Sequence, residues 1–257
     1  MSSKTIKAVI SDLDGVVYRG EEAIPGSIDT IKTWAQRGIP YVFVTNNASR
    51  SAKQFASKIR KLGAPVEPQG VVTSAEATAG HFGISFPRGT SVFAIGEPVL
   101  FDALEREGAR LTDADDAEVV VLGFDYDLTY AKLRRAVRAV MGGARLLVTN
   151  PDRITPTESG FEPCVGATLA AITAAVPSVQ PVIIGKPSPL MINEALRRLG
   201  SDPQSTIMIG DQVATDIVAG QAAGLRSFLV QSGVAAITDP QAVPDAIYPS
   251  LAHIPFD

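Results

Sequence analysis

The chain has 257 residues, enough to bury one large hydrophobic core or two smaller ones. Hydrophobic residues make up 46% of it and charged residues 19%, a balance typical of folded globular proteins. The net charge is -4 and Lys and Arg are not clustered, which disfavours nucleic acid or an anionic membrane as partner. We therefore expect a small-molecule substrate.

The compartment is inferred from three further features. The single cysteine, Cys164, cannot form an internal disulfide. Residues 1–4 lead into a short apolar run and do not resemble a signal peptide. No apolar stretch approaches the ~20 residues needed to cross a bilayer. We expect a cytoplasmic protein that does not act at a membrane.

Short β-branched runs alternate with helical patterns from the N-terminus onward. We expect strands at residues 8–10 and 41–44 and helices at residues 28–36 and 52–62. This alternation predicts an α/β fold with a doubly wound parallel sheet. Apolar runs at residues 182–184 and 207–209 suit strands that are buried on both faces, so we expect both to be central strands.

Two turn-rich segments, residues 86–89 and 177–181, bracket a stretch that repeats the strand-helix pattern. It contains the expected strand-helix units 91–108 and 119–141 and a strand at 146–148. We interpret residues 80–180 as an inserted α/β domain and residues 1–79 and 181–257 as the core domain.

Asp12 and Asp14 follow the first strand directly. Ligands gather at the carboxyl ends of the strands in open α/β sheets, which places both carboxylates at the usual site. One carboxylate can attack phosphorus, and a second one two residues further on can serve as general acid and then as general base. The alternative is an ordinary Asp-Gly turn that closes the strand. Gly15 and Gly20 flank an expected hairpin that would form a small flap beside the site.

Two further polar segments also follow strands. Thr45, Asn46 and Asn47 come after the strand at 41–44 and could bind phosphate oxygens, although Asn47 could instead cap the next helix. Lys186 comes after the apolar run at 182–184 and could neutralise a phosphate, although isolated lysines are usually solvated.

Asp211 follows the strand at 207–209, and Asp216 lies five residues further on. Mg²⁺ prefers oxygen ligands and needs only a few carboxylates, so Asp211 is a candidate ligand, and Asp216 could orient that ligand or a bound water. The alternative is that Asp211 caps a helix at 213–222 and that Asp216, in the first turn of this helix, interacts favourably with the helix dipole. Chance alone would nevertheless rarely bring four polar segments to four strand ends.

These segments resemble the four motifs of phosphatases of the haloacid dehalogenase (HAD) superfamily. The place of the long insert, between the second and third motifs, resembles subclass IIA, the NagD-like or p-nitrophenylphosphatase-like branch with an α/β cap domain. The resemblance rests on residues 12–17, 45–47, 185–187 and 210–217, and in the cap on residues 94–97, 123–125, 149–152 and 163–166.

The resemblance implies a Mg²⁺-dependent phosphatase that forms an aspartyl-phosphate on Asp12, with Asp14 as general acid and base. It implies that Thr45 and Lys186 bind the transferring phosphoryl group, with Asn46 and Asn47 beside it. Mg²⁺ would be held by the side chains of Asp12 and Asp211 and by the backbone carbonyl of Asp14, with Asp216 in support.

Substrate choice is expected to depend on residues 150–166 of the cap, a long polar segment. Its candidate substrate-contacting residues are Asn150, Asp152, Glu158 and Cys164. The expected substrate is a small phosphorylated metabolite: a sugar phosphate, a nucleotide, glycerol phosphate or a similar monoester. The resemblance also allows a homodimer formed through the cap. Outside enzyme catalysis, the alternative is a phospho-accepting regulatory or binding protein on a related scaffold that does not turn over.

Overall fold

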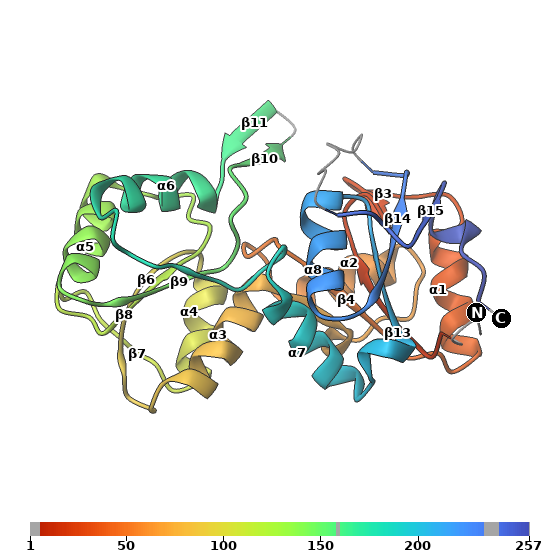
Figure 1. Cartoon of the computed structure of the whole chain (residues 1–257), viewed down its shortest axis with the longest axis horizontal. Coiled ribbons are helices and arrows are strands. Elements are labelled where there is room, and N and C mark those ends of the chain that lie inside the picture. Colours follow the sequence, from red (N-terminus) through yellow and green to blue (C-terminus); the bar gives the residue numbers. More distant parts are fainter. Residues whose placement is uncertain (1–5, 158–159, 234–241, 257) are drawn as a thin grey trace. The chain divides into compact units, whose positions relative to one another are not determined.

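The computed structural model describes residues 6–157, 160–233 and 242–256. The chain falls into two compact units, shown with their elements in Figure 1. The first unit comprises Met1–Thr45, Ala52–Val72 and Lys186–Asp257, and the second comprises Asn46–Ser51 and Thr73–Gly185. The expected cap, residues 80–180, lies within the second unit, and its assignment as a cap domain stays a prediction.

The first unit is built on a six-stranded sheet in the order β15-β14-β13-β1-β4-β5. The pairs β15–β14, β14–β13, β13–β1 and β1–β4 are parallel. This sheet and the second one confirm the predicted α/β class. The strands are β1 (Ala8–Asp12), β4 (Tyr41–Thr45), β5 (Val71–Thr73), β13 (Thr206–Gly210), β14 (Arg226–Val230) and β15 (Ala246–Tyr248), with a separate hairpin of β2 (Tyr18–Arg19) and β3 (Glu22–Ala23).

Helices cover both faces of this sheet. On one face the apolar sides of two helices, with Trp34 and Phe55 fully or almost fully buried, pack on alternate strand residues such as Val9 and Ile207. On the other face α7 contacts β1 and β4, and α8 contacts α7 and β14. The helices are α1 (Ser27–Gln36), α2 (Ala52–Lys61), α7 (Pro189–Leu199) and α8 (Val218–Ala222), with the 3₁₀-helices η1 (Pro68–Gly70), η2 (Pro203–Ser205) and η4 (Leu251–His253) and the π-helix η3 (Val213–Ile217).

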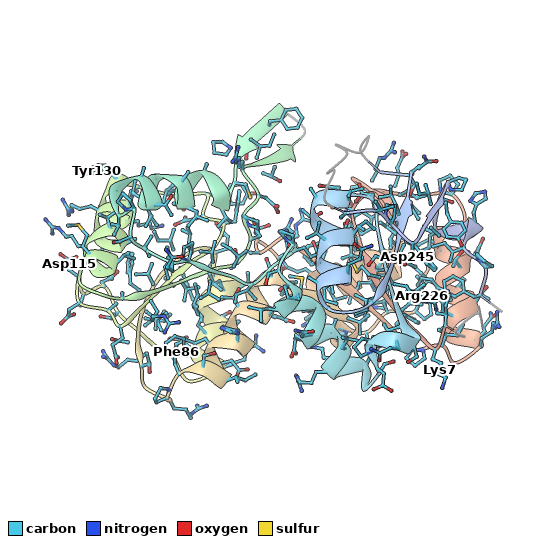
Figure 2. The ribbon with its side chains drawn as sticks, viewed as in Figure 1. Lys7, Phe86, Asp115, Tyr130, Arg226 and Asp245 are labelled. Carbon is cyan, nitrogen blue, oxygen red and sulfur yellow. The ribbon has the colours of Figure 1, made fainter. Side chains whose placement is uncertain are left out.

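Strand β15 is fastened to the sheet by a side chain as well as by its backbone. The backbone N–H of Ser227 donates to Oδ2 of Asp245 at 2.8 Å, just before β15 begins, and Asp245 is labelled in Figure 2. The carboxylate thus supports the last strand pair of the sheet.

The second unit repeats the layered arrangement on a five-stranded sheet in the order β12-β9-β8-β6-β7. Helices α5 and α6 pack on one face, around Val120, Leu146 and Ile172. Helices α3 and α4 pack on the other face, around Phe82, Leu104 and Val121. Its elements are α3 (Ser74–Ser85), β6 (Ser91–Ile95), α4 (Pro98–Arg106), β7 (Arg110–Leu111), β8 (Val119–Leu122), α5 (Tyr130–Met141), β9 (Arg145–Val148), β10 (Ile154–Thr157), β11 (Gly160–Pro163), α6 (Val165–Ala175) and β12 (Val182–Ile183).

The expectation for residues 182–184 was wrong. They form only the short strand β12, an edge strand of the second sheet that pairs with β9, and Val182 and Ile183 are only half-buried. An apolar run is therefore compatible with an edge strand as well as with a central one. By contrast, β13 lies between β14 and β1 and is fully buried, as predicted.

Two other segments differ from the simple patterns expected of them. Residues 150–166 are not one long loop, because β10 and β11 pair there as an antiparallel hairpin. The helix expected at 213–222 begins as a π-helix up to Ile217 and becomes α-helical only from Val218. The backbone N–H of Ile217 accordingly donates to the carbonyl of Gln212, five residues back, at 3.4 Å.

Candidate active site

A buried ionic cluster lies in the first unit. The ammonium of Lys186 donates to Oδ1 of Asp12 at 2.7 Å and to Oδ1 of Asp216 at 2.6 Å. One carboxylate oxygen from each of Asp12, Asp211 and Asp216 lies within 4.8 Å of the other two. All four residues are buried, and Asp12 is the most exposed of them at 8%. We call Asp12, Asp211 and Asp216 the acidic cluster.

Sheet order explains why Asp12 and Asp211 meet. Asp12 is the last residue of β1, and the parallel neighbour β13 ends at Gly210, so both chains leave the sheet at the same edge. On the other side of β1, Asp12 pairs with Val44, so Thr45 ends β4 at the same level. The sheet therefore presents three polar segments at one edge.

Asp216 reaches the cluster because it lies within the π-helix η3 and because Gly210 leaves room for its side chain. A Cβ atom on Gly210 would lie 2.1 Å from the Cβ of Asp216, so only glycine leaves room for this side chain. Oδ2 of Asp216 accepts the backbone N–H of Gln212 at 3.1 Å, which fixes the carboxylate over the end of β13. Gly210 is therefore required for the packing of Asp216.

Asp211 lies between two glycine backbones. A Cβ on Gly15 would lie 2.4 Å from Oδ2 of Asp211, and a Cβ on Gly233 would lie 1.9 Å from the same oxygen. Gly15 also has a φ of 79°, which side-chain-bearing residues rarely adopt. The carboxylate therefore occupies a cradle that a larger residue at either position would fill.

Burial and charge act in opposite directions on these groups. Burial raises the pKa of the Asp12 carboxyl well above its usual range; Lys186 opposes that rise, whereas the charges of Asp216 and Asp211 add to it. Burial alone would lower the pKa of Lys186, but the charges of Asp12 and Asp216 and the hydrogen bonds to them outweigh it and raise its pKa. Lys186 is therefore a permanent cation at neutral pH.

The acidic cluster has the chemistry of a site for a hard divalent cation. It offers three carboxylate oxygens close together, and oxygen is the ligand that Mg²⁺ and similar ions prefer. The ammonium of Lys186 pairs with two of these three acids, Asp12 and Asp216, and an excess of buried charge of one sign is costly unless a counter-charge is supplied. A cation bound among Asp12, Asp211 and Asp216 would offset that excess, so the residues fit a metal.

Asp14 differs from Asp12 in its surroundings. Asp12 is buried, whereas Asp14 is exposed, two residues further along, where the backbone of Asp14 bridges to Tyr18. A group that exchanges protons with a leaving group and with water needs that access. A hairpin of β2 and β3 does follow, but it begins at Tyr18 and turns at residues 20–21, further along the chain than expected, and its role as a flap stays a prediction.

Four of the predicted residues form a hydrogen-bonded network in the second unit. The amide Nδ2 of Asn46 donates to both carboxylate oxygens of Asp152, at 3.3 and 3.1 Å. Nδ2 of Asn150 donates to the backbone carbonyl of Asn46 at 2.8 Å, and Oδ1 of Asn150 accepts the backbone N–H of Asp152 at 3.1 Å. The thiol of Cys164 lies 4.0 Å from that same Oδ1.

Ser74 joins this network, although no sequence pattern indicated it. Its hydroxyl donates to the carbonyl of Asn46 at 2.6 Å, the same oxygen that Asn150 binds. The side chain of Asn46 and its backbone are thus held by residues of the second unit.

Asn47 makes local contacts with a neighbouring serine. Oδ1 of Asn47 accepts the backbone N–H and the hydroxyl of Ser49, at 2.9 and 2.8 Å, which is the local turn chemistry expected of a residue just before a helix. The proposed phosphate contact of Asn47 stays a prediction. Glu158 lies outside the described residues.

Two family models match the chain on either side of its middle segment. A model of the haloacid dehalogenase-like hydrolases matches residues 9–110, and a HAD-hydrolase-like model matches residues 183–254. The 5'-nucleotidase YutF of Bacillus subtilis (strain 168) is 40% identical over 231 residues, which cover 90% of this chain and 89% of that protein. The chain belongs to the haloacid dehalogenase-like hydrolases.

Within the HAD-like hydrolases the chain falls in the family of NagD and the p-nitrophenylphosphatases. A single mutant of the thermostable NPPase from Geobacillus stearothermophilus matches with a TM-score of 0.91 and 38% identity, covering 98% of this chain and 99% of that one. An acid sugar phosphatase of Staphylococcus aureus (strain MRSA252) is 37% identical over 238 residues, or 93% of this chain and 91% of that protein. The predicted superfamily, branch and phosphatase class are confirmed.

No described helix of this HAD-like chain is long and apolar enough to cross a membrane. The cytoplasmic location, the homodimer and the roles of the individual site residues stay predictions.

Proposed function

We propose that this HAD-like phosphatase hydrolyses small phosphomonoesters through an aspartyl-phosphate on Asp12. The observation that carries the proposal is the contact between Lys186 and Asp12 beside Asp211, buried at the carboxyl ends of adjacent strands. The relatives named 5'-nucleotidase and acid sugar phosphatase support nucleotides and sugar phosphates as the substrate classes.

The reaction requires two displacements at phosphorus. In the first, a carboxylate oxygen of Asp12 forms a bond to phosphorus while the bond to the leaving oxygen breaks, and Asp14 donates its proton to that oxygen. In the second, Asp14 takes a proton from water, the water oxygen bonds to phosphorus, and the bond to Asp12 breaks to release phosphate. The exposure of Asp14 suits both proton transfers.

Charge compensation comes from fixed groups. The transferring phosphoryl group spreads negative charge over its equatorial oxygens, and Lys186, already protonated and buried, can stabilise that charge without reorganising. Thr45, at the end of β4 beside Asp12, would donate its hydroxyl to the same group, with Asn46 and Asn47 following it in the chain.

We further propose that the divalent cation of the site is Mg²⁺. The carboxylates of Asp12 and Asp211 and the backbone carbonyl of Asp14 would hold it, and Asp216, which also binds Lys186, would support them. When bound, Mg²⁺ would neutralise charge on the phosphoryl oxygens and on Asp12.

The substrate-contacting residues are proposed to come from residues 150–166, where Asn150, Asp152 and Cys164 already lie together. A homodimer through the second unit is part of the same proposal. Exchanging residues 150–166 for those of a relative should change the ranking of substrates without changing the metal requirement.

The first experiment compares Asp12→Asn, Asp14→Asn and the control Asp29→Asn. Asp29 has an 85% exposed side chain on α1, so its variant should behave as wild type. Phosphate release should be abolished in Asp12→Asn. In Asp14→Asn a phosphoenzyme should accumulate and decay slowly, as measured by acid-quenched labelling. Near-wild-type turnover in Asp12→Asn would refute the proposal.

The second experiment measures phosphate release from a panel of nucleotides, sugar phosphates and other small monoesters, with Mg²⁺ and with chelator. We expect the protein to hydrolyse at least one substrate class with measurable catalytic efficiency in Mg²⁺, and to lose that activity in chelator. A protein that becomes phosphorylated on Asp12 but hydrolyses no ester would instead be a phospho-accepting regulatory protein.

A further inference from the structure

The flap hairpin of the first unit carries an arginine that binds a distant loop. The guanidinium of Arg19, in β2, donates through Nη2 to the backbone carbonyl of Ser232 and to that of Gly233, the latter at 3.1 Å. The two segments are more than 200 residues apart in sequence. The arginine therefore joins the flap to residues 232–233, which follow β14.

Residues 232–233 lie directly against the metal-binding end of the site. The backbone of Gly233 is in contact with the carboxylate of Asp211, close enough that no Cβ would fit between them. The hydroxyl of Ser232 donates at 2.8 Å to the carbonyl of Gly15, the second glycine that touches this carboxylate. Gly233 thus lies on one side of the Asp211 carboxylate and Gly15 on the other, and Ser232 links the two by a hydrogen bond.

The hairpin is itself held in place by other contacts, so the backbone of Arg19 has a fixed position. Tyr18, the residue before it, is 1% exposed, and the ammonium of Lys58 lies 3.9 Å from the centre of its ring. Lys58 also donates to the carbonyl of Gly20 at 2.6 Å and forms an ion pair with Glu21 at 3.2 Å. Helix α2 therefore holds the flap from one side while Arg19 holds the loop on the other.

We propose that Arg19 is a positioning residue for Asp211: it holds residues 232–233 against the carboxylate and so sets the affinity of the site for a divalent cation. The inference rests on the proposed function, because it concerns the metal site assigned there. The backbone of Gly233 has many accessible conformations, and one side chain that binds its carbonyl and the preceding one removes much of that freedom. Groups that orient a metal ligand typically change metal affinity by about 10- to 100-fold.

Three variants test the proposal. Arg19→Ala removes both bonds to the loop, Arg19→Lys keeps the charge and a donor nitrogen on a shorter side chain without the planar guanidinium, and Arg37→Ala is the matched control. Arg37 is also exposed and also donates to a backbone carbonyl of the first unit, that of Phe256. Calorimetric titration of each purified protein with Mg²⁺, without substrate, gives the affinity directly.

We expect the Kd for Mg²⁺ to rise about 10- to 100-fold in Arg19→Ala, to recover in part in Arg19→Lys, and to change less than about 2-fold in Arg37→Ala. Turnover at saturating Mg²⁺ should return close to wild type in Arg19→Ala, because no reacting group is removed. A folded Arg19→Ala with wild-type Mg²⁺ affinity would overturn the inference.

If Arg19→Ala does not fold, Ser232→Ala is the second variant with which to test the role of the loop. It removes only the bond to Gly15 and should weaken Mg²⁺ binding in the same direction; unchanged affinity would count against the inference. The outcomes separate the two proposals. Wild-type protein that binds no Mg²⁺ contradicts the proposed metal site, whereas equal binding by wild type and Arg19→Ala contradicts only the role of Arg19.

Discussion

Replacing Lys186 by methionine should destabilise the first unit by about 3–5 kcal/mol. The ammonium makes two buried contacts, at 2.7 and 2.6 Å, and hydrogen bonds to charged groups contribute about 1.5–3 kcal/mol each. The methionine side chain offsets part of that loss of stability, because burying it does not require the desolvation of a charged group. The carboxylates of Asp12 and Asp216, however, are left buried without their cation, and removing one partner of a buried ion pair costs about 3–5 kcal/mol.

The sequence supplies a probe for this measurement. Trp34 is the single tryptophan of the chain and is fully buried in the core of the first unit, so its fluorescence follows the unfolding of that unit. Urea unfolding in chelator should give the free energy of unfolding for Lys186→Met and for the control Lys53→Met, an exposed residue on α2. Turnover of Lys186→Met should also fall at least about 10²-fold, because a preorganised charge at the phosphoryl group is lost.

A loss of stability below about 1 kcal/mol, or equal to that of Lys53→Met, would refute the reasoning, since breaking a buried ion pair should cost several times more. It would mean that Lys186 does not compensate the acidic cluster in the folded protein.

Three further predictions concern the same residues and the thiol. Gly210→Ala should lose about 1–3 kcal/mol of stability and most of its activity, since the new Cβ would lie 2.1 Å from that of Asp216; urea unfolding and phosphate release measure both. Added Mg²⁺ should raise the thermal midpoint of wild type but not of Asp211→Asn, because binding to the folded state alone stabilises it. Burial raises the pKa of the Cys164 thiol to about 11, so iodoacetamide at mildly alkaline pH should label native protein far more slowly than urea-unfolded protein, as followed by mass spectrometry.

The positions of Asp12, Asp211 and Thr45 at one sheet edge could be predicted because the rule behind them is topological. Parallel strands with short polar segments after them bring those segments to the same edge, whatever the details of the side chains. The pairing of β1 with both β13 and β4 then decides which segments are neighbours. The resemblance to the HAD motifs pointed to the same residues.

The direct contact between Asp216 and Lys186 could not be predicted from the sequence. Asp216 was expected either to orient Asp211 or a bound water, or only to occupy the first turn of a helix, but the π-helix and Gly210 bring its carboxylate to 2.6 Å from the ammonium. A spacing of five residues does not reveal whether the helix is wound regularly. Gly210 ends a strand, and it also leaves the space into which Asp216 packs.

Two other features left no pattern in the sequence. Arg19 binds backbone carbonyls, and carbonyls are present at every residue, so nothing in the sequence marks Ser232 and Gly233 as its partners. The strand β12 has the apolar composition of a central strand, yet it pairs on one side only. Which sheet it joins depends on long-range packing that periodicity does not record.

The order of the strands has a consequence for synthesis on the ribosome. Strand β1 pairs with β4, which follows it closely, and with β13, which begins only at Thr206. Until β13 emerges, a nascent chain carries one side of β1 as an open row of backbone N–H and C=O groups, a template for pairing with other chains. The strand that carries the proposed nucleophile is therefore protected late, and any truncated product ending before residue 206 would keep that unpaired edge permanently.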